Sequence, residues 1–295
     1  MSIHPKVSII LVNYNGYRDT IECLQSLREI TYTNHEVIVI DNASTNESVK
    51  EIRDFICEGE FLIPSEVNGG FSAGNNIGIK YALDHEADYC LLLNNDTLVE
   101  PDFLSALMSV SEDKGRKAVI TSKILYNSDR DRIWYAGGDI NGITSRTIHY
   151  GMGMKDDGNY NQQKKVSFIT GCCMLIPREI IERVGLLKEE FFLYCEDLSY
   201  SIEIKRAGYS MIYEPKSIIY HKVNASTKKI TDAIIYYSVR NKLYIIRWYY
   251  TGLRRIIALL YQMMEIVKRL LCREYKWCIV TQACGDFVCG KTGKR

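Results

Sequence analysis

The stretch VSIILVNYNG, residues 7–16, begins with an apolar run and ends in a polar turn. The run at residues 7–12 predicts a buried strand, because strands covered on both faces read as continuous apolar segments. A helical pattern follows, and Asp19 with Glu22 three residues later is typical of a capping box at a helix start. A strand that leads into a helix is the unit from which parallel sheets are built.

The same alternation continues through the first half of the chain. Further strands are predicted at Glu36–Ile40, Phe61–Ile63 and Tyr89–Leu93, with helices near Val49–Ile56 and Ala73–Leu83 and after Pro101. Sequential β-α-β units favour parallel pairing with right-handed crossovers. The sequence therefore predicts an α/β fold with a mostly parallel central sheet and helices on both faces.

The second half is less regular. Strands are predicted at Ala118–Ser122 and Val166–Ile176, separated by a Gly, Asn and Asp-rich stretch that we expect to form a mobile loop. A helix is predicted over Leu198–Ala207 and ends at Gly208. Residues Thr231–Leu271 predict two further helices that break near Thr251-Gly252.

Charge divides the chain of 295 residues into two parts. Residues 1–221 hold 22 Lys and Arg against 32 Asp and Glu, whereas residues 222–295 hold 15 against 4. An acidic body with a basic tail predicts parts that meet different neighbours. Apolar residues make up 46% and charged residues 25%, which excludes wholesale disorder and collagen-like structure.

Compartment is predicted from two absences in the sequence. No secretory signal is evident, and the longest uncharged apolar run in the tail, Ile256–Met264, is far shorter than the roughly 20 residues that span a bilayer. Ten cysteines in such a chain are expected to be reduced thiols. We therefore expect a cytoplasmic protein, with contact to the inner face of the plasma membrane as an option.

Polar clusters follow the predicted strands at the ends where open parallel sheets bind ligands. They are Asn13-Tyr14-Asn15, Asp41-Asn42-Ala43-Ser44 and Asn94-Asn95-Asp96, with Asn68–Asn76 before a helix. Each cluster alone is also what an ordinary loop looks like, because Gly, Asn and Asp favour turns. Together on one rim they predict a ligand site.

These segments carry a family resemblance. VSIILVNYNG, EVIVIDNAS, NGGFSAGNNIG, YCLLLNND, FFLYCEDLSY, KRAGY and IIYHKVNAS, in this order, resemble the inverting family 2 glycosyltransferases of GT-A (Rossmann-like) fold. The basic segment CGDFVCGKTGKR is similar to the tail of their rhamnosyltransferase-like branch. The resemblance implies a catalytic domain over residues 1–225, with a nucleotide-sugar half to about residue 113 and an acceptor half beyond it. Residues 226–295 are then a basic amphipathic helical extension.

The resemblance implies a nucleotide-sugar site on the polar rim. Either Asp41 or Asn42 would accept the imide N–H of uracil or thymine, since a carboxylate and an amide oxygen both accept hydrogen bonds. Tyr14 would pack against the base, and the alternative is that it only caps the edge of the sheet. The expected donor-binding residues are Val12, Tyr14, Asn15, Asp41, Asn42, Asn68, Gly70, Asn75, Asn94, Asn95 and Asp96.

The resemblance also implies that a divalent cation, Mn²⁺ or Mg²⁺, binds at the site. The family's acidic triplet is Asn94-Asn95-Asp96 here, so one carboxylate remains for the metal. His221 matches the position that adds an imidazole, which favours Mn²⁺ over Mg²⁺. Two alternatives stay open, because a lone His is more often structural and the depleted triplet allows weak metal binding.

Glu196-Asp197 matches the family's acidic pair. The resemblance implies that Asp197 deprotonates the acceptor hydroxyl as general base and that Glu196 orients the site. The alternative for Asp197 is a structural N-cap of the following helix. Direct attack of the acceptor oxygen on the anomeric carbon would invert its configuration.

The expected function is transfer of a sugar from a UDP- or dTDP-sugar to a hydroxyl of a glycan or lipid-linked saccharide in surface polysaccharide synthesis. The branch resemblance points to dTDP-rhamnose. A nucleotidyltransferase and a non-catalytic sugar-nucleotide-binding protein are the alternatives. The tail helices either pack on the body or lie on an anionic membrane, with Arg247, Trp248, Tyr249, Tyr250, Arg254 and Arg255 at headgroup level. No nucleic-acid partner is expected.

Overall fold

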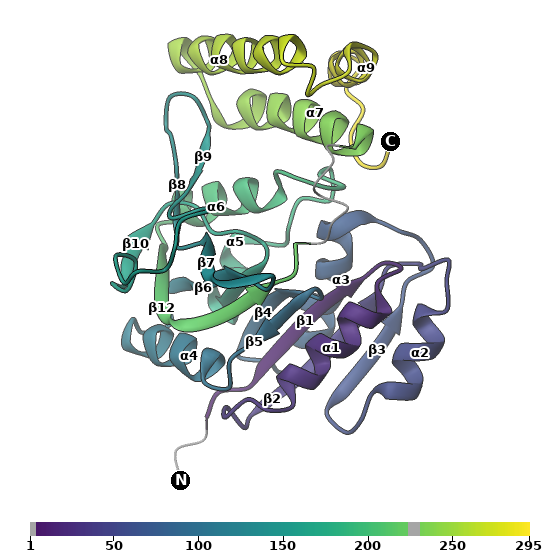
Figure 1. The fold of residues 1–295 in the computed structure, drawn as a ribbon, viewed down its shortest axis with the longest axis vertical. Helices are drawn as coiled ribbons and strands as arrows, with labels where there is room; N and C mark the ends of the chain where they lie inside the picture. Colours follow the sequence, from purple (N-terminus) through teal and green to yellow (C-terminus); the bar gives the residue numbers. More distant parts are fainter. Residues whose placement is uncertain (1–3, 224–230) are drawn as a thin grey trace.

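A mixed ten-stranded sheet forms the centre of the protein (Figure 1), seen in a computed structural model that describes residues 4–223 and 231–295. Its strand order is β10-β12-β6-β11-β4-β1-β2-β3, with β5 beside β12 and β7 beside β6. The strands of the first half are β1 (Val7–Asn13), β2 (His35–Asp41), β3 (Glu60–Pro64), β4 (Tyr89–Asn94) and β5 (Thr97–Val99). Those of the second half are β6 (Ala118–Tyr126), β7 (Asp129–Tyr135), β10 (Lys164–Val166), β11 (Cys173–Pro177) and β12 (Ser210–His221). A separate two-stranded sheet consists of β8 (Gly138–Ile140) and β9 (Thr147–His149).

Strands β1 to β4 pair with one another in parallel, as the alternation predicts. β1 pairs in parallel with β2 and β4, and β2 pairs in parallel with β3. In this register Asn13 lies opposite Asp41, and Val12 lies opposite Asn94. The polar clusters therefore meet on one rim, as expected from their positions after the strands.

Helices cover both faces of this half. Ile9 and Leu11 belong to the apolar cluster beneath α1 (Tyr17–Leu27) and α4 (Phe103–Asp113). Ile10, between them, belongs to the cluster beneath α3 (Gly70–Asp84). Alternating side chains on β1 thus enter two cores, because successive residues of a strand point to opposite faces. The remaining helices of the body are α2 (Ser48–Phe55), α5 (Arg178–Val184) and α6 (Glu196–Arg206).

The second half departs from the predicted pattern. β11 enters between β4 and β6 and runs antiparallel to both. The single strand predicted over Val166–Ile176 is therefore wrong, since β10 and β11 are separate strands with a turn at Gly171-Cys172 between them. The stretch expected to be a mobile loop contains β7, β8 and β9, because its Gly and Asn residues form turns between short strands.

Three predicted helix starts also need correction. α1 begins at Tyr17 with Gly16 as N-cap, so Asp19 lies in the first turn and not at the cap. α4 begins two positions after Pro101, at Phe103. The N-cap of α6 is Cys195, in the left-handed region at φ 74°, which removes the capping alternative for Asp197. The end of α6 is confirmed, because Gly208 follows it with φ +87°.

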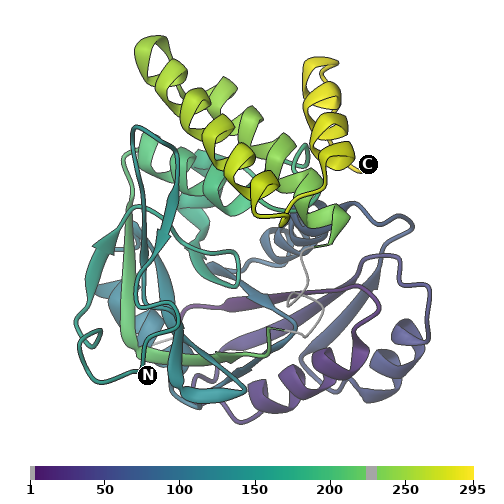
Figure 2. The ribbon, with the colours of Figure 1, turned by 45° about the horizontal axis from the view of Figure 1, so that its top comes forward.

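The C-terminal helices pack on one another at one end of the molecule, outside the central sheet (Figure 2). They are α7 (Asp232–Tyr249), α8 (Gly252–Leu271) and α9 (Trp277–Val288), and the predicted break at Thr251-Gly252 is confirmed. α7 packs on the body: Asn241 Nδ2 donates to the carbonyls of Leu193 and Tyr194, each at 2.9 Å. The predicted domain boundary at residues 225/226 lies outside the described residues. Within 4–223 and 231–295, no helix has the length and apolarity to cross a membrane.

Candidate active site

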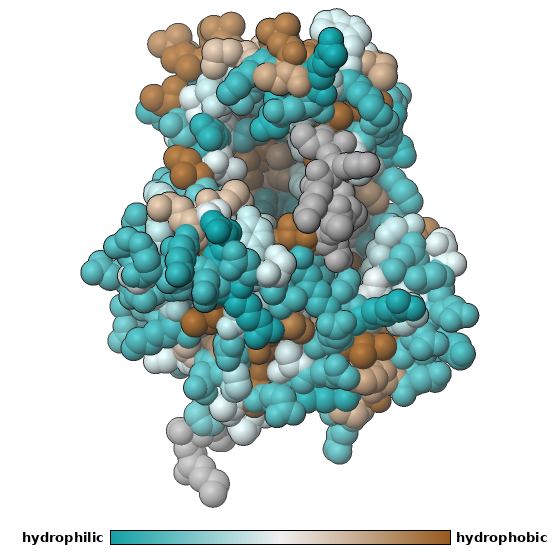
Figure 3. All heavy atoms as spheres, in the orientation of Figure 1, coloured by the Kyte–Doolittle hydropathy of each residue, from teal (hydrophilic) through white to brown (hydrophobic). Residues whose placement is uncertain are grey.

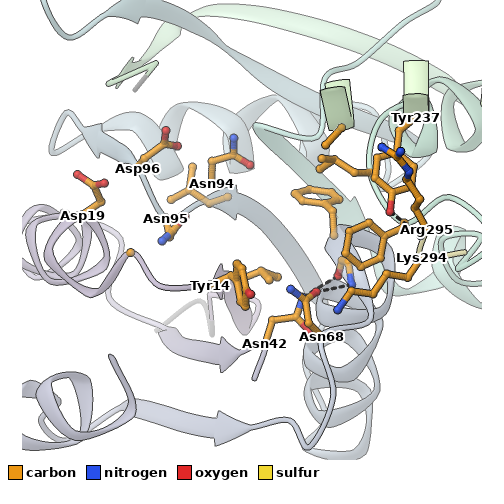
Figure 4. A pocket seen from close by; sticks show the side chains of 18 residues that line it. Tyr14, Asp19, Asn42, Asn68, Asn94, Asn95, Asp96, Tyr237, Lys294 and Arg295 are labelled. Atoms are coloured by element: carbon orange, nitrogen blue, oxygen red, sulfur yellow. Dashed lines mark hydrogen bonds between the residues drawn. The ribbon is translucent and has the colours of Figure 1, made fainter. Parts of the chain in front are cut away.

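A pocket of about 850 Å³ opens at the polar rim, between the carboxyl ends of the parallel strands and the C-terminal helices. Figure 3 shows the surface hollowed there. Figure 4 shows Asn94, Asn95, Asp96 and Asp19 on one side, Tyr14, Asn42 and Asn68 near the middle, and Tyr237, Lys294 and Arg295 on the other. The other lining residues are Val12, Gly16, Gly70, Phe71, Leu93, Phe192, Leu193 and Ala233.

Most of the donor-binding residues expected from the sequence line this pocket. They are Val12, Tyr14, Asn42, Asn68, Gly70, Asn94, Asn95 and Asp96. Tyr14 is 49% exposed, so its ring offers a free face to a ligand. Gly70 has φ +83°, and a Cβ there would come within 2.0 Å of the Phe192 carbonyl oxygen. Glycine is therefore required at the first residue of α3, where the helix lies against the Phe192 backbone.

Asp41 lies behind the pocket wall and not in it. Its carboxylate is fully buried and accepts bonds from Asn13 Nδ2 at 2.7 Å and from the Ser44 amide and hydroxyl at 2.9 and 2.7 Å. Asn42 is the member of the pair that reaches the pocket, where its Nδ2 donates to the Gly70 carbonyl. Of these two residues, Asn42 is therefore the one that faces the pocket.

Asn15 and Asn75 are also outside the pocket lining. Asn15 is exposed and its Oδ1 accepts the Thr45 amide at 2.8 Å, which joins the loops after β1 and β2. Asn75 is 2% exposed and donates to the Phe71 carbonyl within α3. Both residues therefore stabilise the rim through hydrogen bonds, and neither lines the pocket.

Asn13 holds the rim together, although sequence reasoning gave it no individual role. Its Nδ2 donates to Asp41, while its Oδ1 accepts the Gly16 amide at 3.1 Å and the Thr20 hydroxyl at 3.0 Å. The Thr20 hydroxyl in turn accepts Asn95 Nδ2 at 2.8 Å. One buried amide thereby connects the ends of β1 and β2, the start of α1 and the triplet.

Asp96 and His221 meet at the same rim. The distance from His221 Nε2 to Asp96 Oδ1 is 3.1 Å, and both side chains are largely buried. The Trp134 ring contacts the imidazole edge to face with centroids 4.6 Å apart. His221 Nδ1 is buried and has no hydrogen-bond partner within the described part of the chain. Nε2 is therefore the ring nitrogen of His221 that faces the Asp96 carboxylate.

The Asp96–His221 pair offers the donor chemistry of a divalent cation, one carboxylate oxygen and one imidazole nitrogen. Across residues 4–223 and 231–295 no group of three His, Cys, Asp or Glu side chains is arranged to hold a metal ion. Any cation here would therefore need the remaining ligands from a bound molecule or water.

Glu196 and Asp197 start α6 close to this rim. Asp197 Oδ2 accepts the Gly171 amide at 3.3 Å, and Oδ1 accepts the Leu198 amide at 2.7 Å. The neighbouring Cys172 carbonyl accepts the amide of Asn94 at 3.0 Å. One short segment thus connects Asp197 to the triplet, although neither acidic residue lines the pocket.

Burial dominates the electrostatics of this acidic pair. Burial, together with the neighbouring Asp197 charge, raises the pKa of the Glu196 carboxyl to about 8. Burial also raises the pKa of Asp197, but the amides of Leu198 and Gly171 and the Lys242 ammonium oppose that shift. Glu196 Oε2 has no partner among the described residues. Asp197 is therefore the better stabilised anion of the two.

Sequence reasoning missed the wall formed by Phe192, Tyr237, Lys294 and Arg295. The Arg295 amide donates to the Tyr237 hydroxyl at 2.8 Å, and the Gly293 amide donates to the Glu190 carbonyl at 2.8 Å. Lys294 Nζ lies 5.7 Å from the Phe192 ring centroid. The basic composition of the tail was the available signal, but it does not reveal which cations reach the pocket.

The loop that carries Phe192 is tied to α3. The Ser72 hydroxyl donates to the Phe191 carbonyl at 3.1 Å, and the Phe71 amide donates to the Phe192 carbonyl at 3.0 Å. Asn76 exchanges bonds with Leu187, donating to its carbonyl at 2.9 Å and accepting its amide at 3.0 Å. The two sides of the pocket are therefore fixed to one another.

These features define a GT-A glycosyltransferase fold with a rim suited to a nucleotide ligand. The chain belongs to glycosyl transferase family 2, whose family model matches residues 8–185. It is 28% identical over 203 residues to the low-salt glycan biosynthesis hexosyltransferase Agl10 of Haloferax volcanii, covering 68% of this chain and 62% of that one. It is 24% identical over 279 residues to the dTDP-rhamnosyl transferase RfbF of Shigella flexneri, covering 91% and 87%.

Solved structures share the fold. The mannosyltransferase PcManGT of Pyrobaculum calidifontis, in complex with GDP-Man and Mn²⁺, matches with a TM-score of 0.60 at 15% identity, covering 96% of this chain and 80% of that one. GalNAc-T7, crystallised with UDP, GalNAc and Mn²⁺, also gives 0.60 at 18% identity, covering 73% and 43%. At such identities the likeness concerns the fold.

Proposed function

We propose that this protein transfers a sugar from a nucleotide-sugar donor to a hydroxyl of a glycan. The observation that carries the proposal is the arrangement around Asn94: the Asp96–His221 pair and the Asp197 segment both adjoin it, at the edge of a pocket of about 850 Å³. Family membership supports the reaction class.

The donor is a UDP- or dTDP-sugar in this proposal. The base packs on Tyr14, and Asn42 Oδ1, which accepts one bond from the Gly69 amide, has a second lone pair for an imide N–H. Lys294 and Arg295 offer positive charge to the diphosphate from the opposite wall. The match to RfbF over most of both chains supports dTDP-rhamnose as the first donor to test.

Asp96 and His221 would hold a divalent cation, and Mn²⁺ suits the imidazole better than Mg²⁺. The distance of 3.1 Å between His221 Nε2 and Asp96 Oδ1 supports this assignment, because one cation could contact both atoms. Structural neighbours carrying Mn²⁺ support the ion class. When bound, such a cation would supply positive charge that stabilises the leaving nucleoside diphosphate.

Asp197 acts as general base in the proposal. Its carboxylate accepts two backbone amides at the start of a helix, which favours the anion that must take the acceptor proton. Glu196, with its raised pKa, stays neutral beside it and leaves a single charge at the site. A single displacement by the activated oxygen inverts the anomeric carbon. The acceptor is a lipid-linked or growing saccharide at the cytoplasmic face of the membrane.

Product analysis tests the proposal directly. The chain is incubated with dTDP-rhamnose, UDP-glucose or UDP-GlcNAc, Mn²⁺ and saccharide acceptors, and the released nucleotide is identified by chromatography. We expect a nucleoside diphosphate and an elongated acceptor of inverted anomeric configuration. Release of pyrophosphate instead would identify a nucleotidyltransferase. Donor-induced thermal stabilisation without any transfer or donor hydrolysis would identify a binding protein.

A further inference from the structure

α8 carries an exposed apolar stripe along the outside of the molecule. We use the name α8 stripe for Leu253, Ile256, Ile257, Leu260, Met263, Met264, Val267 and Leu271, all of which are exposed. Leu253, Leu260 and Leu271 are 71%, 66% and 79% exposed. Figure 3 shows hydrophobic side chains gathered over α8, and Figure 1 shows α7 between this helix and the sheet.

The stripe occupies one side of the helix. Its members recur at intervals of three and four residues, which places them on a single face of a helix of 3.6 residues per turn. Ala258 and Ile266 are buried and belong to the other side, which packs inward. Because α8 has 20 residues, the stripe extends for about 30 Å. One side of α8 thus packs inward through Ala258 and Ile266. The opposite side is also apolar, and no described part of the chain covers it.

The aromatic residues expected at a membrane surface do not form this face. Tyr250 is buried, and the Tyr249 hydroxyl bonds Ser199 and Glu203 on the body at 2.7 and 2.8 Å. The Trp248 ring packs against Phe191 in a tilted arrangement with centroids 5.3 Å apart. These side chains pack on the catalytic body, so any membrane contact must come from the next helix.

The surroundings of the stripe are basic. Arg254 and Lys268 are exposed on α8, and Lys276 is exposed just before α9. Trp277, which follows, is 69% exposed. Residues 222–295 hold 15 Lys and Arg against 4 Asp and Glu. Exposed aliphatic side chains with basic neighbours and an exposed Trp are the features of helices that lie in the headgroup region of anionic bilayers.

We infer that the α8 stripe docks on the surface of an anionic phospholipid bilayer, with α8 parallel to the membrane plane. A second copy of this chain is a poorer occupant, because a two-fold contact would place two basic tails against each other. A bilayer also accommodates a convex, single-helix surface that offers no groove. The inference goes beyond the proposed function, since docking requires neither donor nor catalysis.

Vesicle flotation of the full chain tests this inference. Vesicles of phosphatidylglycerol and phosphatidylcholine are compared with vesicles of phosphatidylcholine alone, at low and high salt. We expect binding to the anionic vesicles that weakens as salt rises. Met263→Glu with Met264→Glu, at 49% and 58% exposure, should weaken binding by about tenfold or more. Met152→Glu with Met154→Glu, at 48% and 52% exposure on the body, is the matched control and should bind as the unaltered chain does.

Two outcomes would overturn the inference. One is a folded chain, shown by a cooperative melting transition, that stays with the buffer in the presence of anionic vesicles. The other is equal loss of binding in both variant pairs. Light scattering identifies the competing occupant: a dimer that only the Met263/Met264 variant dissociates would assign the stripe to a second copy. Donor-induced thermal shifts are measured on the same samples, so failure of docking is separable from failure of the proposed function.

Discussion

His221 Nε2 lies 3.1 Å from Asp96 Oδ1, and the sheet itself sets this distance. β12 pairs antiparallel with β5, which places His221 opposite Thr97, the residue after Asp96. The amide of Lys222 donates to the Asp96 carbonyl at 3.0 Å. Two positions far apart in the chain are thereby held together before any ligand arrives.

Replacing the imidazole tests its role toward a cation. We expect His221→Ala to raise the Mn²⁺ concentration needed for half-maximal nucleotide-induced thermal stabilisation by about tenfold, since loss of a ligand or its support commonly has an effect of this order. The readout is a Mn²⁺ titration at fixed dTDP. His85→Ala, an exposed histidine far from the rim, is the control. An unchanged Mn²⁺ midpoint in His221→Ala would assign the imidazole a structural role.

Removing the proposed base should affect turnover and spare donor binding. We expect Asp197→Asn to lower kcat by roughly 10²- to 10⁴-fold, which is the usual contribution of a general base. The donor-induced melting shift should remain, because Asp197 does not line the pocket. Asp113→Asn is the matched control, because it makes the same substitution at an exposed carboxylate that pairs with Lys114. Near-normal turnover in Asp197→Asn would remove this residue from the mechanism.

Glu196 makes stability depend on pH. Burial raises its pKa from an ordinary 4.5 to about 8, so the folded chain binds a proton that the unfolded chain has released between these values. Stability from this group is therefore complete below pH about 4.5 and is lost as pH rises toward about 8. Urea unfolding across this range should show a falling free energy of unfolding, and Glu196→Gln should flatten the fall. An identical slope in the two proteins would contradict the assignment.

Gly70 and Gly59 form a matched pair, because both have φ +83° but only Gly70 has a close neighbour. Gly59→Ala should cost about 1 kcal/mol from backbone strain alone. Gly70→Ala adds a clash with the Phe192 carbonyl and should cost more, together with weaker donor binding. Chemical denaturation and dTDP thermal shifts measure the two effects. Equal destabilisation in both variants would mean that the Phe192 backbone moves to accommodate the added Cβ and would contradict the predicted clash.

Lys294 should contribute to donor affinity. We expect Lys294→Gln to weaken dTDP binding several-fold, with a smaller dependence on salt, because one positive charge leaves the pocket wall. Lys291→Gln is the control, since that ammonium pairs with Asp286 and does not line the pocket. Isothermal titration at two salt concentrations provides the comparison. Equal affinities for the two variants would place Lys294 outside the donor site.

The parallel half of the fold was predictable because its information is local. Each strand of that half is an apolar run such as Val7–Val12, and consecutive units pair with near neighbours. The insertion of β11 between β4 and β6 is not local, since it depends on contacts between distant segments. The turn at Gly171-Cys172 inside an apolar stretch gave no periodic signal, so one strand was predicted where two occur.

The candidate site likewise combines features that the sequence predicts with features that depend on distant contacts. Polar residues after strands, such as Asn42 and Asp96, were predictable because strand ends share a rim. Whether Asp41 faces the ligand or the interior depends on the hydrogen bonds from Asn13 and Ser44, which no spacing reveals. Lys294 reaches the pocket only because α7 and the residues after α9 fold back over it.

The bonds from Ser72 and Asn76 to the loop at residues 187–192 bear on protein engineering. A chimera that joins residues 1–113 to the second half of another family member would separate α3 from the loop carbonyls that accept its hydrogen bonds. To transfer the specificity of one such enzyme to another, this loop and α3 must therefore be exchanged together. A library that varies the loop alone would mostly sample misaligned pockets.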